Sequence, residues 1–510
     1  MNTLQKAVVI FIALLAFSLI LMFSIHISSD SIGIAIAKSW CSTVGINASN
    51  YTCLDMLNSY RYSMAQGLAL ALFLLVIALT ALKMEWRLGA AMLALIALIL
   101  TGIAVPQEII LAVRWDLILF LIGSMTLAGI LRALGVFRFI VIKMLKITKG
   151  NAVVLIAFLT ILAYILSATL NEVTSIVYVT MLALELGRIL GVSITPLLIL
   201  LVLATNTGSS ALPIGNPIGV YLLYKTNMSM SEFIRISFPA SLINLVALLI
   251  FFVVVEKGLI KSLTDSLSKH RKRVEALITR YEIELQSEAD KVARIRIGLV
   301  IFLLFMITPA LNDFIAQGLS MLFNEYIDPH EFLSFIPYIY IVVLSVIIGL
   351  EEVARFIEKS VDWSSLLFFV MLFMLSDRLT YTGVIAKLTY VLASISSSPI
   401  AIIALMLVSS ATLSSVLDNL SVIVTFTPIA MMLKNVGLAS SLMYFALLFG
   451  GVYGGNYTPI GSTANIVAVG LAEKHKIKIT WREWLKLALV ATTIQIVVAL
   501  AYLYIMQLFV

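Results

Sequence analysis

The chain alternates long apolar runs with short polar segments. The first apolar runs cover residues 4–27 and 63–82, the third ends near residue 105, and later runs open at Trp115 and Trp363. None shows the strict apolar–polar alternation of a membrane β-strand, and most approach the roughly 20 residues with which a helix crosses the hydrocarbon core. We therefore expect helical membrane spans, including the first run, which has no clear signal-peptidase cleavage site.

Two apolar stretches carry a polar interruption at their centre. Residues 170–174 read Leu-Asn-Glu-Val-Thr, and residues 417–421 read Leu-Asp-Asn-Leu-Ser. A charged side chain at the middle of a bilayer is unfavourable by roughly 3 kcal/mol even on the lenient insertion scale, so an acid there points to function. At the first interruption, each apolar arm can be a separate span, or the two arms can form a re-entrant hairpin with its polar tip at mid-membrane.

Two further runs contain residues that break helices. Asn, Gly and Pro interrupt residues 195–224 between positions 206 and 219, and residues 450–465 read GGVYGGNYTPIGSTAN. This density of breakers predicts discontinuous helices. Their freed backbone groups are tolerated in a membrane only where they are buried in protein or line a cavity.

The two halves of the chain repeat these features in the same order. The tryptophans that open two of the runs pair at an offset of 248 residues, the polar interruptions at 247, and the two Pro-Ile-Gly motifs at 246. The motifs Ser-x-x-Glu at residue 229 and Thr-x-x-Glu at residue 480, each a capping box that opens a helix, pair at 251. The sequence therefore predicts an internal repeat.

The charge pattern sets the orientation of the two copies. Residues 132–149 carry five Lys or Arg and no acid, which places that end of the fourth span in the cytoplasm. Counting spans places the amino terminus inside, the carboxyl terminus outside and the basic turn at residues 474–478 inside. The copies are then inverted. We expect an all-α polytopic membrane protein of two inverted repeats, each with a re-entrant hairpin and a broken helix, as in secondary transporters.

These features divide the chain into four segments. We predict an extra first span with an external loop over residues 1–62, repeat 1 over 63–255, a cytoplasmic linker over 256–296 and repeat 2 over 297–510. In the linker, apolar residues recur at near-helical spacing from Leu259 to Leu285. This spacing predicts an amphipathic helix on the inner membrane surface, and a solvated linker is the alternative.

Composition agrees with a membrane protein and narrows its class. Of 510 residues, 61% are hydrophobic and 12% charged, whereas about a quarter are charged in soluble proteins. The net charge of +7 comes from Lys and Arg in the polar segments, so it indicates orientation rather than nucleic-acid binding. The sequence shows no GxxxxGK[ST] motif, nucleophile–base pair or metal-ligand cluster, so we expect no ATPase or other enzyme and no bound cofactor.

Both cysteines of the chain lie in the first polar loop. Cys41 and Cys53 flank the sequons at Asn47 and Asn50. We expect an external loop closed by a disulfide and open to glycosylation, and two free thiols are the alternative.

The polar interruptions, the breaks and the run GGNYTPIGSTANIVAVGLAEKHKIKITWREWLK together resemble the ion transporter superfamily. Within it they are similar to the branch of arsenite-efflux proteins, sodium–proton antiporters and the melanosomal P protein, with a citrate-transporter-like domain. The resemblance covers residues 115–504. It implies a scaffold domain and a transport domain that moves by an elevator-like shift, usually in a homodimer. The chain departs from the family at the first tip, where Asn171-Glu172 stands in place of the common Asp-Asn, and at Ser421, where Pro is common.

Fifteen residues at the tips and breaks are candidates for binding the substrate or an ion. They are Asn171, Glu172, Thr174, Asn206, Thr207, Ser209, Asn216, Asp418, Asn419, Ser421, Asn456, Thr458, Ser462, Thr463 and Asn465. Asp418 and Glu172 are the acids suited to carry a proton or ligate a cation, and Asp418 with Asn419 is a candidate Na⁺ site. The neutral side chains can bind Na⁺ or an oxyanion, or can instead cap helices and satisfy freed backbone groups.

We expect a secondary active transporter coupled to H⁺ or Na⁺. The resemblance favours efflux of arsenite or another small inorganic anion, and Na⁺/H⁺ antiport is the nearest alternative. A di- or tricarboxylate transporter is less favoured, because superfamily members with those substrates carry neutral Ser-Asn-Thr tips. A channel would instead show flux without gradient-driven accumulation. The expected partners are the substrate ion, membrane lipid and a second copy in a homodimer in the cell membrane.

Overall fold

The computed structural model describes residues 3–137, 139–140, 143, 151–170, 172–269, 279, 289–396 and 398–509. These residues form α-helices and short 3-10 or π segments joined by turns, without β-strands. The all-α class predicted from the apolar runs is confirmed.

The chain divides into two compact units. The first unit takes residues 1–114, 363–451 and 500–510, and the second takes residues 115–362 and 452–499. Each unit therefore combines segments from both halves of the sequence.

The first unit is organised around the helix α4. Its helices are α1 (Thr3–Ser24), α2 (Ser31–Thr43), α3 (Asn50–Asn58), α4 (Tyr60–Leu82), α5 (Arg87–Leu100), α6 (Pro106–Leu111), α21 (Trp363–Thr382), α22 (Val384–Ile395), α23 (Pro399–Ser414), α24 (Asn419–Asn435) and most of α25 (Leu442–Gly454). α4 packs against α1, α5 and α21.

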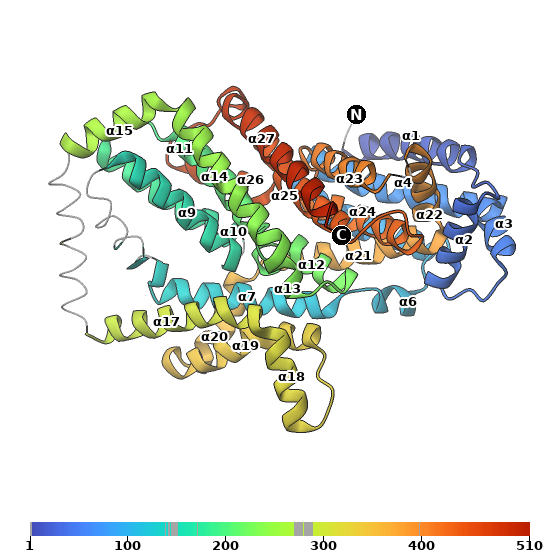
Figure 1. Cartoon of the computed structure of the whole chain (residues 1–510), viewed down its shortest axis with the longest axis horizontal. Coiled ribbons are helices and arrows are strands. Elements are labelled where there is room, and N and C mark those ends of the chain that lie inside the picture. Colours follow the sequence, from blue (N-terminus) through green and yellow to red (C-terminus); the bar gives the residue numbers. More distant parts are fainter. Residues whose placement is uncertain are drawn as a thin grey trace. The chain divides into compact units, whose positions relative to one another are not determined.

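The second unit contains two groups of packed helices. Its helices are α7 (Trp115–Ala133), α9 (Ala152–Leu170), α10 (Glu172–Leu190), α11 (Thr195–Ser209), α12 (Pro217–Thr226), α13 (Met230–Glu232), α14 (Phe238–Val255), α15 (Lys257–Lys269), α17 (Ala289–Ile307), α18 (Asn312–Phe323), α19 (Pro329–Ile348), α20 (Leu350–Ser360), α26 (Thr463–Lys474) and most of α27 (Trp481–Gln507). α11 packs against α9, α10 and α14, whereas α7 packs against α19 and α20 (Figure 1).

Seven of the described helices are long and apolar enough to cross a membrane. They are Tyr60–Thr80, Trp115–Ala133, Ala152–Thr169, Met230–Val255, Glu331–Ile348, Trp363–Thr382 and Trp481–Gln507. The predicted first and third spans correspond to shorter apolar helices, Val8–Ser24 and Arg87–Leu100. The chain is therefore a multi-pass membrane protein.

Both polar interruptions separate two helices. α9 ends at Leu170 and α10 begins at Glu172, while α23 ends at Ser414 and α24 begins at Asn419. The two helices of each pair pack against each other. Re-entrance of these pairs, like the inversion of the repeats, stays a prediction.

Both runs rich in Gly, Pro and Asn form discontinuous helices, as predicted. The first consists of α11, the 3-10 turn Pro213–Gly215 and α12. The second consists of α25, the 3-10 turn Gly455–Tyr457 and α26. The Pro residues and the extended backbone of Asn216 and Ser462 interrupt the helical hydrogen bonds at these points.

The predicted amphipathic linker helix is present in part. α15 buries Leu259, Leu263 and Leu267 on one face and packs against α9, α10 and α14 (Figure 1). Most of the remaining linker, residues 270–278 and 280–288, lies outside the described residues. The place of this segment on the inner membrane surface stays a prediction, as does the alternative of a solvated linker.

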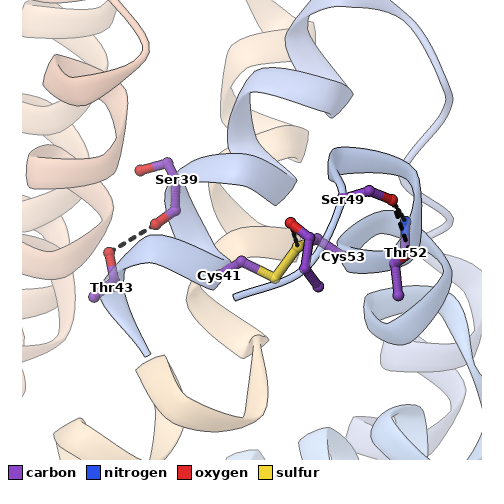
Figure 2. The surroundings of a disulfide bond; sticks show 7 residues. Ser39, Cys41, Thr43, Ser49, Thr52 and Cys53 are labelled. Carbon is purple, nitrogen blue, oxygen red and sulfur yellow. Dashed lines mark hydrogen bonds between the residues drawn. A yellow bond between two sulfur atoms is a disulfide. The ribbon is translucent and has the colours of Figure 1, made fainter. Parts of the chain in front are cut away.

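The first polar loop folds into α2 and α3. A disulfide joins Cys41 in α2 to Cys53 in α3 (Figure 2), with their Cα atoms 6.1 Å apart. Asp30 caps the amino terminus of α2, and Ser49 caps that of α3. The bridge links two short helices that have little core of their own.

The first broken helix lies very close to α9 because Gly208 has no side chain. A Cβ atom at this position would lie 2.2 Å from the backbone oxygen of Tyr164 and 2.7 Å from its Cα atom. These are backbone atoms of a packed helix, so a larger residue requires α9 and α11 to separate.

We expect Gly208→Ala to lower the free energy of unfolding by about 1–3 kcal/mol, because the added methyl group overpacks this crossing. The matched control is Gly470→Ala in α26, where an added Cβ meets nothing within 4 Å. The control is expected to remain within about 1 kcal/mol of the unsubstituted protein. Thermal unfolding of both variants in detergent measures the difference, and equal melting temperatures would contradict the close crossing.

Candidate functional site

A buried cluster of neutral polar side chains joins the two broken helices within the second unit. The amide nitrogen Nδ2 of Asn206 lies 2.6 Å from Asn456 Oδ1, 3.0 Å from Asn465 Oδ1 and 3.2 Å from Ser462 Oγ. All four side chains are at most 1% exposed. Asn206 belongs to the first broken helix and the other three belong to the second.

The second helical segment of each broken helix, α12 or α26, begins with the same kind of cap. The side chain of Asn216 accepts a hydrogen bond from the backbone N–H of Gly219 at 2.6 Å. The side chain of Ser462 accepts one from the backbone N–H of Asn465 at 3.3 Å. Both pairs are related by the offset of 246 residues that also relates the two Pro-Ile-Gly motifs. Each break therefore holds the amino terminus of a half-helix, where unpaired N–H groups and the helix dipole favour negative charge.

Side chains from α11 and α27 hold Asn456 in place. Its Nδ2 donates to Gln495 Oε1 at 3.0 Å, and Gln495 Nε2 donates to Thr207 Oγ1 at 2.6 Å. The indole nitrogen of Trp484 donates to the backbone oxygen of Asn456 at 3.0 Å. The sequence interpretation missed Gln495 and Trp484. An amide within the otherwise apolar last span was the available signal for Gln495.

Asn465 donates hydrogen bonds to two backbone groups at the second break. Its Nδ2 donates to the backbone oxygens of Gly455 at 2.9 Å and Thr458 at 2.8 Å. Thr463 begins the half-helix next to it and is half-buried, as is Thr458. Asn465 thus stabilises the turn between α25 and α26 and also faces Asn206.

The structure places the acid of the first tip beside the first break. Glu172 is 8% exposed, and its Oε2 accepts a hydrogen bond from Ser209 Oγ at 3.4 Å. Asn216 Nδ2 donates to both the backbone oxygen and the hydroxyl of Ser209, at 2.8 and 3.1 Å. Asn171 and the side chain of Thr174 lie outside the described residues.

The second tip lies in the first unit. Asp418 is half-buried and caps α24, because its Oδ2 accepts from the backbone N–H of Ser421 at 3.2 Å and from the Ser421 hydroxyl at 3.3 Å. Ser414 Oγ lies 2.5 Å from Asn419 Oδ1 and 2.6 Å from the backbone oxygen of Gly451. The Na⁺ site at Asp418 and Asn419 stays a prediction.

Within the second unit, the structure brings together the first tip and both breaks. The first tip and both breaks belong to the second unit, whereas the second tip belongs to the first unit beside the end of α25. A single site formed by both tips and both breaks stays a prediction. The side chains bonded in the second-unit cluster are amides and hydroxyls, with Glu172 the one carboxylate among the described contacts.

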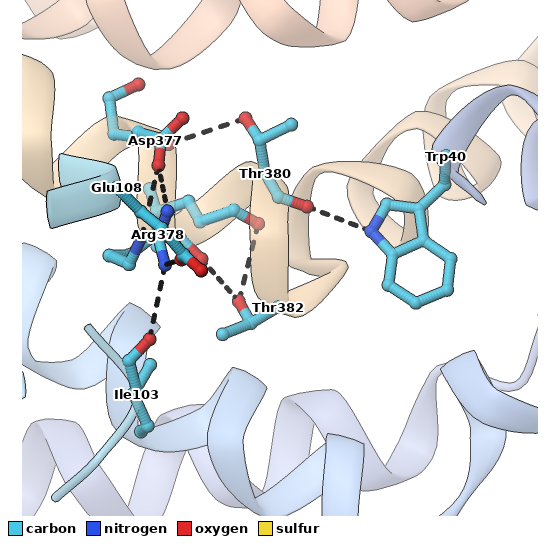
Figure 3. Close-up of polar contacts among 9 residues, drawn as sticks. Trp40, Ile103, Glu108, Asp377, Arg378, Thr380 and Thr382 are labelled. Atoms are coloured by element: carbon cyan, nitrogen blue, oxygen red, sulfur yellow. Dashed lines mark hydrogen bonds and ion pairs between the residues drawn. The ribbon is translucent and has the colours of Figure 1, made fainter. Parts of the chain in front are cut away.

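The first unit contains a buried cation that the sequence interpretation did not use. Arg378 in α21 has a side chain only 4% exposed and pairs with Asp377 at 2.5 Å and Glu108 at 3.0 Å (Figure 3). Its guanidinium also stacks on Tyr381, with its carbon 4.4 Å from the ring centre. Asp377 is therefore one of the two carboxylates that form ion pairs with Arg378.

A second buried cation caps the helix α1. Lys387 Nζ donates to the backbone oxygen of Met22 at 2.5 Å and to Ser63 Oγ at 3.2 Å. Met22 lies in the last turn of α1, where carbonyl groups lack helical partners and the dipole favours a cation. Lys387 therefore attaches α1 to the rest of the first unit.

Comparison with known proteins shows which family the chain resembles. The citrate transporter family model matches residues 74–450. An uncharacterized transporter of Mycobacterium tuberculosis is 26% identical over 405 residues, which cover 77% of this chain and 86% of that protein. An uncharacterized transporter of Synechocystis is 24% identical over 432 residues, covering 80% and 90%. The P protein of Homo sapiens is 25% identical over 447 residues, covering 77% of this chain and 53% of the P protein.

We expect Asn465→Ala to lower the free energy of unfolding by about 1–3 kcal/mol, because the buried backbone oxygen of Gly455 loses a donor while that of Thr458 keeps the N–H of Gly461. Asn244→Ala is the matched control. Asn244 is also fully buried, but its amide donates only to Ala240 in its own helix. Thermal unfolding of the purified variants compares the two, and a loss at Asn465 no greater than at Asn244 would refute its role at the break.

Proposed function

Because this chain belongs to the citrate transporter family and is a multi-pass membrane transporter, we propose that it is a secondary active transporter coupled to H⁺ or Na⁺. The observation that carries the proposal is the polar cluster where two broken helices meet in the second unit. Broken helices of this kind form the substrate and ion sites of secondary transporters, since their half-helix termini offer N–H and C=O groups within the membrane.

The proposed substrate is a small inorganic oxyanion such as arsenite, moved out of the cell. Beside the cluster, the first break offers further neutral amide and hydroxyl groups at Asn216 and Ser209, which suit the uncharged hydroxide form of such a substrate. Two helix amino termini add only about half an elementary charge each, so a multivalent carboxylate is less well matched. The family description names citrate, and citrate is therefore included among the substrates to be tested.

Na⁺/H⁺ antiport is the second candidate, and Glu172 is the observation that favours it. This carboxylate is buried next to the first break and is bonded to Ser209. A buried acid that exchanges a proton for a cation changes the charge of the site during each cycle. Asp418, half-buried at the second tip, is the other proposed coupling acid.

The larger arrangement is proposed on the same basis. It comprises two inverted repeats, a scaffold and a transport domain with an elevator-like shift, and a homodimer in the cell membrane. The amino terminus is proposed to lie in the cytoplasm and the carboxyl terminus outside. The supporting observation is the cluster of five Lys and Arg at residues 132–149, which follows the positive-inside rule.

The transport assay uses the purified protein in liposomes with an imposed pH or Na⁺ gradient, and offers arsenite, Na⁺ and citrate in turn. We expect accumulation of arsenite against its gradient when a pH or Na⁺ gradient is present. Accumulation of Na⁺ alone supports antiport, and accumulation of citrate alone overturns the substrate proposed here. Flux that only dissipates gradients identifies a channel.

We expect Asp418→Asn and Glu172→Gln each to lower the coupled flux at least about tenfold, which corresponds to roughly 1.4 kcal/mol. Each substitution keeps the shape of the side chain and removes its titratable group. The matched control is Glu325→Gln, at an exposed loop acid, which is expected to transport normally. Unchanged coupled flux in both variants contradicts the proposed coupling role.

A further inference from the structure

The side-chain amide of Asn206 faces the polar cluster with its nitrogen and leaves its carbonyl oxygen unpaired. Its Oδ1 is fully buried and has no hydrogen-bond partner among the residues that the structure describes. Its Nδ2 faces three oxygens within 3.2 Å, although an amide nitrogen carries only two hydrogens. A buried polar atom without a partner in a native structure calls for an explanation, and a water molecule or an ion that binds there is one.

The orientations of the neighbouring amides are fixed by their own bonds. Asn465 Nδ2 donates to two backbone oxygens, at Gly455 and Thr458, which cannot themselves donate. Its Oδ1 must therefore point into the cluster, where it also accepts from Ser462 Oγ at 2.6 Å. Asn456 Nδ2 donates to Gln495, which likewise directs its Oδ1 inward.

The side-chain oxygens of Asn456 and Asn465 accept hydrogen bonds, whereas that of Asn206 accepts none from any described residue. The Asn206 amide can therefore turn without breaking a bond to its own oxygen. Half a turn about its terminal torsion exchanges Nδ2 and Oδ1, which have nearly the same size. The turn gives up the hydrogen bonds from Nδ2 and places a fourth oxygen beside Asn456 Oδ1, Asn465 Oδ1 and Ser462 Oγ. Four oxygens then converge with too few hydrogens to bind one another, so the turned state requires a cation.

We propose that Asn206, Asn456, Ser462 and Asn465 form a Na⁺ site at the crossing of the two broken helices, which opens when the Asn206 amide turns its oxygen inward. The ligands are three amide oxygens and one hydroxyl, from α11 on one side and from the second break and α26 on the other. This inference extends the proposed function by naming the coupling ion and its place.

The donor set favours Na⁺ over other ions. All four ligands are neutral and fully buried, whereas Ca²⁺ and Mg²⁺ sites use carboxylates or retained waters. Transition metals prefer nitrogen and sulfur ligands, which these positions do not supply. A proton has no basic group to occupy, because neither an amide nor a hydroxyl titrates near neutral pH.

The site also explains how the crossing stays intact without the ion. In the structure, the Asn206 amide donates hydrogen bonds to the same oxygens that the ion would bind. Asn206 thus stands in for Na⁺, so the two broken helices remain connected in both states. Binding exchanges a direct contact between them for one through the ion, and the helices can change their separation or angle at that step.

The test measures equilibrium binding of radioactive Na⁺ to the full-length purified protein in lipid nanodiscs, with choline maintaining the ionic strength. We expect saturable binding to the unsubstituted protein. Asn206→Leu removes one ligand at nearly constant volume and is expected to raise Kd at least about tenfold. The matched control is Asn244→Leu, at another fully buried Asn with an unpaired Oδ1, which is expected to keep Kd within about twofold.

A second variant keeps the test decisive if Asn206→Leu does not fold. Asn206→Asp places carboxylate oxygens beside three other oxygens, and an ionised carboxylate has no hydrogen to donate, so Na⁺ binding is expected to tighten about tenfold or more. Unchanged Kd in this variant, or in Asn206→Leu, overturns the site.

The outcomes also separate this site from the transport proposal. Gradient-driven accumulation in liposomes without saturable Na⁺ binding overturns the site and leaves the proposed transport standing. Saturable Na⁺ binding that depends on Asn206, without gradient-driven accumulation of any substrate, supports the site and overturns the proposed function.

Discussion

The second unit depends on one constraint, which is that a helix broken inside a membrane must find new partners for its backbone groups. Lipid offers none, so side chains supply them. Asn465 donates to two carbonyls at the second break. Asn216 and Ser462 accept from backbone N–H groups at the starts of α12 and α26. Asn465 therefore both stabilises the second break and takes part in the polar cluster, because its Nδ2 donates to the carbonyls and its Oδ1 is left to face Asn206.

The two units place buried polar groups in different ways. In the first unit two basic side chains are buried: Arg378 pairs with two carboxylates, and Lys387 caps the end of α1. In the second unit the cluster consists of neutral amides and hydroxyls joined across the breaks. Charged pairs favour one fixed arrangement, since separating them leaves an uncompensated charge. Neutral groups exchange partners at lower free-energy cost, which suits a position where a substrate or ion enters and leaves.

Small residues allow these polar contacts to form. Gly208 brings the backbone of α11 against Tyr164 in α9, two positions after Asn206 in the chain. A side chain at Gly219 would likewise meet the backbone oxygen of Pro213 at 2.7 Å. The glycines thus set how closely the helices and the turn at the break approach. The amide side chains then form hydrogen bonds across the remaining distance. Packing and polar satisfaction are coupled here, so a change in one disturbs the other.

The sequence by itself determined the helical class, the membrane spans, both breaks and the capping boxes at Ser229 and Thr480, because each depends on neighbouring residues and on the absence of water. It also placed Asn206, Asn456 and Asn465 among the candidates. Only the tertiary structure decided that these three meet, and that Gln495 and Trp484 hold Asn456 from a helix further along the chain. Contacts between distant segments follow from packing, and an apolar run with one amide does not say which partner that amide will find. The unpaired oxygen of Asn206 follows from those contacts and has no signature in the sequence.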